Sequence, residues 1–151
     1  MAILTRTVEY QDGEREFDAY MAWEDGGSDP KPGVIVSHAW GGRSDFEDAK
    51  ADKLAELGYV GFAIDPYGKG QRGGSKEENS ALMQPLLDDR EMLQRRMSIA
   101  LDTLRRQKEV DDARVAAMGF CFGGLCVLDL ARTGADVSGV ASFHGLFGKP
   151  G

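Results

Sequence analysis

The sequence predicts an α/β fold in which helices flank a mostly parallel sheet, as a single domain over residues 1–151. Short continuous apolar runs, typical of strands buried on both faces, alternate with segments of helical periodicity. This alternation favours parallel strands joined by right-handed crossovers. A chain of 151 residues with 42% hydrophobic residues is long enough for one core.

The first strands are expected to form an antiparallel hairpin. Residues 7–11 and 16–23 flank Asp12-Gly13, a pair typical of hairpin turns. In the second segment apolar side chains alternate with others, which predicts one buried face. The apolar runs 33–37 and 59–64 then predict two strands that are covered on both sides.

Three helices are expected before the last third of the chain. Ser44 to Glu47 form a capping box, which predicts a helix that runs to about Leu57 and stops at Gly58. Residues 77–87 are polar and predict a partly helical segment. Residues 88–107 have an apolar stripe and predict the longest amphipathic helix.

The stretch around Cys121 predicts a sharp turn from a strand into a helix. It reads G-F-C-F-G-G between an apolar run and an apolar helix. Glycines on both sides of the thiol remove side chains that such a turn would crowd, as in the G-x-S-x-G nucleophile elbow. The positive end of the following helix favours the thiolate. A further strand is expected at 139–143.

Charge and cysteine content exclude several classes of partner. The net charge of −7 disfavours nucleic acid and anionic membrane, and the chain has no apolar run of the ~18 residues that a transmembrane helix needs. The N-terminus lacks the layout of a secretory signal, so we expect a cytoplasmic protein. Cys121 and Cys126 lie too far apart on one helix for a disulfide and have no nearby histidine, so free thiols and no metal site are expected.

The elbow resembles that of the dienelactone hydrolase family, a branch of the α/β-hydrolases with a cysteine nucleophile. Three further stretches, 34–42, 61–70 and 141–145, fall where this family places them. The resemblance implies an α/β-hydrolase fold and hydrolysis of a small-molecule ester or lactone. It also implies that Cys121 attacks the carbonyl and that no cofactor or metal takes part.

Site residues follow from the elbow, because parallel sheets gather function at the carboxyl ends of their strands. The backbone N–H groups of Phe122 and Trp40 are expected to hold the developing oxyanion. His38, Tyr67 and His144 also follow strands and are candidates for lining the pocket.

One departure from the family pattern concerns the substrate. Ala39 stands where the best-known members have a glutamate that communicates with the thiol, and alanine can neither accept nor hold a proton. Activation of the thiol must then come from the helix dipole and a histidine. Arg72 and Arg90 are candidates, by region alone, for the arginines that bind a substrate carboxylate.

The general base is not evident. In α/β-hydrolases an acid and then a histidine follow the nucleophile, whereas the two histidines here are His38 and His144. We expect the chain to be the N-terminal portion of a longer hydrolase, incomplete after the strand at 139–143, whose open edge would favour self-association. The alternatives are that His144 is a substitute base, or that the protein is an inactive module that binds ligands or senses redox state through its thiol.

Gly68 to Gly73 match the spacing G-x-G-x-x-G. A dinucleotide site needs these glycines to lead directly from a strand into a helix, but Asp65-Pro66-Tyr67 intervene. The segment is therefore predicted to be a flexible loop.

Overall fold

The computed structural model describes residues 2–150, in which one mixed sheet has the strand order β1-β2-β4-β3-β5-β6. The strands are β1 (Ile3–Asp12), β2 (Arg15–Glu24), β3 (Lys31–Ser37), β4 (Val60–Ala63), β5 (Val110–Phe120) and β6 (Val140–Phe143). The helices are α1 (Asp45–Glu56), α2 (Lys76–Asp88), α3 (Arg90–Arg105) and α4 (Phe122–Arg132).

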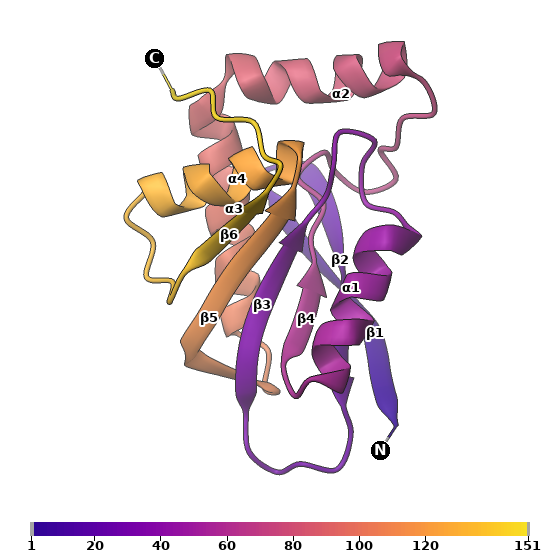
Figure 1. Ribbon diagram of the computed structural model, residues 1–151, viewed down its shortest axis with the longest axis vertical. Coiled ribbons are helices and arrows are strands. Elements are labelled where there is room, and N and C mark those ends of the chain that lie inside the picture. The colour runs from indigo at the N-terminus through magenta and orange to yellow at the C-terminus, as the bar shows by residue number, and fades with distance from the viewer. Residues whose placement is uncertain (1, 151) are drawn as a thin grey trace.

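The predicted α/β fold is confirmed. Strands β4, β3, β5 and β6 run parallel to one another. Strands β1 and β2 form an antiparallel pair at one side, and β2 also pairs antiparallel with β4. Figure 1 shows α1 on one face of the sheet and α3 and α4 on the other. Helix α2 lies across the end toward which the parallel strands point (Figure 1). This end therefore combines strand ends, helix starts and one covering helix.

The N-terminal hairpin is longer than its side-chain pattern predicted. Strands β1 and β2 pair over ten residues each, from Ile3 opposite Glu24 to Asp12 opposite Arg15. Most of β1 is partly or fully exposed, so its residues lack the regular alternation of apolar and polar side chains that marks a half-buried strand. Backbone hydrogen bonds extend the ladder independently of side-chain polarity.

Local capping sets the helix boundaries. The Ser44 N–H donates to Glu47 Oε1 at 2.8 Å, and the Ser44 hydroxyl accepts from the Phe46 N–H, so the predicted capping box is confirmed. The long amphipathic helix begins at Arg90 rather than at residue 88. Asp89 is the one non-helical residue between α2 and α3, and its carboxylate caps the start of α3 by accepting from the Met92 N–H.

Two cores of different size hold the layers together. The larger lies between the sheet and helices α3 and α4 and is built from large side chains such as Phe62, Met97 and Leu125. The smaller packs α1 on the sheet through alanines and Val36. A Cβ on Gly61 would overlap the Ala51 backbone, so α1 lies directly on β4.

Strand β6 lies at the sheet edge and pairs with β5 in residues 2–150. The side chain of Phe143 is 44% exposed there. The open edge that the sequence indicated is present, and self-association through it stays a prediction. None of the helices described is long and apolar enough to cross a membrane.

Candidate active site

Cys121 occupies a strained backbone conformation at the carboxyl end of β5. It is the single residue between β5 and α4, with φ 57° and ψ −115°. Few residues other than glycine adopt a positive φ, and those that do concentrate at functional sites. The turn places the thiol at the start of α4, where free backbone N–H groups and the helix dipole favour negative charge.

Three glycines make the turn possible because the backbones around it nearly touch. A Cβ on Gly119 would overlap the carbonyl group of Gly123, and one on Gly123 would overlap the carbonyl of Ser37. A Cβ on Gly124 would overlap the Ser142 hydroxyl. The start of α4 thus lies directly against β3, β5 and β6. No other residue type fits these positions without moving backbone.

The backbone of Cys121 is held on both sides. Its N–H donates to the Phe143 carbonyl at 3.0 Å, and its carbonyl accepts from Gly124 at 2.9 Å and from Leu146 at 3.3 Å. The side chain of Cys121 is partly exposed, whereas Cys126 is fully buried one turn into α4. Burial raises the pKa of the Cys126 thiol far above its usual value. Both thiols are free, as predicted, and they differ in accessibility.

The two amides predicted to hold an oxyanion lie in the expected elements. Phe122 is the first residue of α4, and Trp40 lies in the turn after β3. Neither N–H donates to a protein acceptor in the turns, loops and caps of residues 2–150. Their catalytic role stays a prediction.

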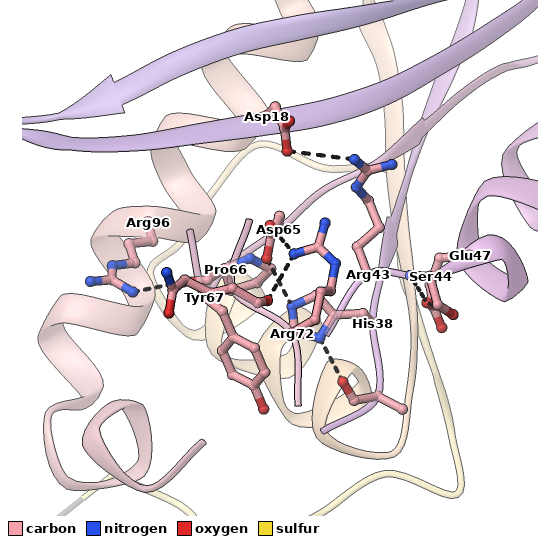
Figure 2. A network of polar contacts seen from close by, with 12 residues as sticks. Asp18, His38, Arg43, Ser44, Glu47, Asp65, Pro66, Tyr67, Arg72 and Arg96 are labelled. Atoms are coloured by element: carbon pink, nitrogen blue, oxygen red, sulfur yellow. Dashed lines mark hydrogen bonds and ion pairs between the residues drawn. The ribbon is translucent and has the colours of Figure 1, made fainter. Parts of the chain in front are cut away.

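His38 and Tyr67 are buried and form part of the support of the turn after β3 (Figure 2). His38 Nδ1 lies 2.6 Å from the Ala39 carbonyl oxygen, and the Tyr67 hydroxyl donates to the Trp40 carbonyl at 2.7 Å. The two rings lie 4.5 Å apart. Neither ring is exposed by more than 2%. In residues 2–150 these two side chains are covered by protein.

Asp65 is a site residue that the sequence analysis did not single out. Its carboxylate is fully buried, with Oδ1 3.5 Å from His38 Nε2 and Oδ2 2.7 Å from the Arg72 guanidinium. Figure 2 shows the side chains of His38, Asp65 and Arg72 close together. The sequence signal that could have found it is an acidic residue at the end of the apolar run that contains β4.

Arg72 and Arg90 are each engaged with a buried carboxylate. Arg90 contacts Asp129 through two hydrogen bonds, at 2.6 and 2.7 Å, and these raise the pKa of its guanidinium. Arg90 also donates to the Gly148 carbonyl. Arg72 pairs with Asp65. The Arg90 guanidinium is thus engaged by Asp129 and Gly148, whereas Arg72 uses one nitrogen for Asp65 and its side chain stays 33% exposed.

His144 is exposed beside a hollow next to the elbow. It directly follows β6, with φ 39°, and its ring centre lies 6.4 Å from that of Phe120. The hollow has a volume of about 450 Å³ and is lined by Ala39, Gly41, Gly42, Ser44, Phe46, Glu47, Gly73, Phe120 and His144. Aromatic rings and glycines dominate this lining.

The G-x-G-x-x-G stretch is a loop, as predicted. It lies between β4 and α2, and Gly68 and Gly70 have φ values of +117° and +77°. It does not lead from a strand directly into a helix. Residues 2–150 also contain no group of three or more His, Cys, Asp or Glu side chains that could hold a metal ion.

The comparisons with known proteins agree with this geometry. The family model described as "Dienelactone hydrolase family" matches residues 17–150. The chain belongs to the dienelactone hydrolase family. Its six-stranded mixed sheet with flanking helices is the α/β-hydrolase fold of that family. The chain is therefore related to hydrolases.

Similar proteins include curated relatives and solved structures. A protein of Aquifex aeolicus (strain VF5), provisionally named as a carboxymethylenebutenolidase, is 31% identical over 76% of this dienelactone hydrolase family chain. The solved structure named m3DLH has a TM-score of 0.95 and 36% identity over 99% of the chain. A dienelactone hydrolase-like promiscuous phosphotriesterase from metagenomic libraries has a TM-score of 0.92 and 39% identity over 96%.

The chain spans only part of these relatives. It covers 52% of the Aquifex protein, 63% of m3DLH and 60% of the phosphotriesterase.

Proposed function

We propose that the whole protein hydrolyses a carboxylic ester or lactone with Cys121 as its nucleophile. The observation that carries this proposal is the positive φ of Cys121 at a strand-to-helix turn, where three glycines let α4 begin against the sheet. Strained conformations of this kind expose a nucleophile at the carboxyl end of the sheet. Membership of a hydrolase family favours this function over a ligand-binding or redox-sensing module.

The reaction would proceed through an acyl-enzyme. The Cys121 thiolate attacks the carbonyl carbon, a carbon–sulfur bond forms, and the carbonyl electron pair moves to oxygen. The N–H groups of Phe122 and Trp40 would hold this oxyanion. Its collapse expels the alcohol oxygen and leaves a thioester. Water then attacks the thioester and releases the acid.

The second half of the reaction needs a general base. His38 is buried and its Nδ1 lies against the Ala39 carbonyl, so it is not placed to take a proton from water at a thioester. His144 is exposed beside the elbow and is one source of the base. The other is a histidine elsewhere in the whole protein, since the relatives are longer than this chain.

The hollow beside the elbow supports an uncharged substrate. Ala39 contributes no carboxylate, and the Arg72 and Arg90 guanidinium groups are engaged with buried aspartates. A neutral ester with an apolar group fits this lining better than a lactone with a free carboxylate. We place the protein in the cytoplasm, which is supported by the free thiols of Cys121 and Cys126.

The test is a burst experiment with p-nitrophenyl acetate. The 151-residue chain should release close to one equivalent of p-nitrophenolate as Cys121 is acylated. Cys121→Ala should release none above the buffer rate, whereas Cys126→Ala, the matched control, should keep the burst. A burst that persists in Cys121→Ala would refute the proposal.

Turnover after the burst locates the base. Turnover by the 151-residue chain that is lost in His144→Ala would assign the base to His144. If the burst forms but turnover is slow and unaffected by His144→Ala, the base lies elsewhere in the whole protein.

A further inference from the structure

The peptide group between Ala39 and Trp40 is fixed by hydrogen bonds to its carbonyl. The Ala39 oxygen accepts from the Gly42 N–H at 3.1 Å and lies 2.6 Å from His38 Nδ1. Because a carbonyl oxygen can only accept, Nδ1 must carry the proton. In a trans peptide the carbonyl and the N–H point in opposite directions. Donors that hold the Ala39 carbonyl therefore also set the direction of the Trp40 N–H.

The next two carbonyls of the same turn are held by the loop between β4 and α2. The Trp40 carbonyl accepts from the Tyr67 hydroxyl at 2.7 Å, and the Gly41 carbonyl accepts from the Gly73 N–H at 3.0 Å. The carbonyl groups of Ala39, Trp40 and Gly41 thus each accept a hydrogen bond, although none of them belongs to a helix or strand. The carbonyl groups of this turn are thus held, while the Trp40 N–H has no acceptor in the turns, loops and caps of residues 2–150.

The second nitrogen of the His38 ring faces a buried carboxylate. Its Nε2 lies 3.5 Å from Asp65 Oδ1, and both side chains are fully buried. Neither atom has a hydrogen-bond partner among the residues described, because 3.5 Å is too long for a directed bond. Arg72 fixes the other carboxylate oxygen of Asp65 at 2.7 Å. The Asp65 carboxylate therefore lies against the Nε2 edge of the His38 ring (Figure 2).

We infer that His38 is a positioning residue of the oxyanion hole, which aims the Trp40 N–H by donating to the Ala39 carbonyl. Asp65 and Tyr67 support this arrangement from the loop after β4. The inference rests on the proposed function, in which the Trp40 N–H binds the oxyanion. The loop that contains the G-x-G-x-x-G stretch then also supports the oxyanion hole, because the Gly73 N–H donates to the Gly41 carbonyl.

Two reagents separate this role from a purely structural one. Acylation of Cys121 by p-nitrophenyl acetate forms a sulfur–carbon bond, develops negative charge on the carbonyl oxygen and expels p-nitrophenolate. Alkylation by iodoacetamide forms a sulfur–carbon bond and expels iodide without an oxyanion. A misdirected Trp40 N–H should therefore slow acylation and leave alkylation unchanged.

The matched variants are His38→Gln and His38→Asn. The asparagine amide nitrogen occupies about the position of Nδ1 and can still donate to the Ala39 carbonyl. The glutamine amide reaches the position of Nε2, toward Asp65, and loses that donor. We expect acylation of Cys121 to fall about 10- to 100-fold in His38→Gln and to be largely retained in His38→Asn. The iodoacetamide rate should match the wild type in both.

Each outcome decides the inference. Equal acylation in wild type and His38→Gln, or equal loss of acylation and alkylation, would overturn it. If both His38 variants fail to fold, Tyr67→Phe, which removes the hydroxyl bound to the Trp40 carbonyl, should show the same selective loss of acylation, and a wild-type acylation rate would overturn the inference. A wild-type Cys121 that is alkylated but never acylated would instead refute the proposed function.

Discussion

The backbone of Cys121 predicts an inverted order of stability for two simple variants. With φ 57° and ψ −115°, any residue with a Cβ is strained, whereas glycine reaches this region freely. Such strain costs about 1–3 kcal/mol. Replacing alanine by glycine removes this strain, but it also costs about 0.4–1 kcal/mol because the unfolded chain gains conformational freedom. Taking the middle of both ranges, Cys121→Gly should therefore be more stable than Cys121→Ala by roughly 1.3 kcal/mol.

Urea unfolding followed by circular dichroism measures this difference, since both variants lack the thiol and differ only at Cβ. In a thermal scan the same free energy corresponds to about 2–8 °C for a domain of this size. Ala113, an exposed residue in β5, supplies the control. There Ala113→Gly should lower stability by about 0.5–1 kcal/mol, the opposite sign. An alanine variant at position 121 as stable as the glycine variant would refute the strain argument.

Three further results are expected. Gly123→Ala should lower the free energy of unfolding by about 2–3 kcal/mol, because its Cβ would overlap the Ser37 carbonyl, while Gly139→Ala, which faces open space, should change it little in the same urea titration. Burial keeps the Cys126 thiol protonated in the folded state, whereas the unfolded thiol ionises near pH 8.5, so high pH favours unfolding. This group should contribute a loss of about 2 kcal/mol between pH 8 and pH 10 that is absent from the pH titration of Cys126→Ala. Iodoacetamide labelling read by mass spectrometry should modify Cys121 well before Cys126, because only Cys121 is exposed; equal rates would contradict the burial difference.

Local patterns were sufficient to predict most of the fold. The capping box at Ser44 and the apolar runs of β3 and β4 depend on neighbours in the sequence, so their elements were placed within a few residues. The pattern was less informative where tertiary or backbone effects decide. Strand β1 extends beyond the residues that the hydrophobic pattern predicted. The boundary between α2 and α3 depends on a single capping residue, Asp89.

The candidate site divides in the same way. Cys121 and the elbow could be predicted because the glycines that permit the turn are adjacent to it in the sequence. The pairing of Arg90 with Asp129 could not, because it joins two helices far apart in the chain. The same holds for the approach of Asp65 to His38, which depends on the neighbouring strands β4 and β3.

The most direct test of a cysteine nucleophile is the intact mass of the protein after brief exposure to an activated acetyl ester. The account predicts one added acetyl group, located on Cys121 by peptide mapping and absent from Cys121→Ala. An unmodified Cys121, or acetyl groups confined to surface lysines, would contradict it.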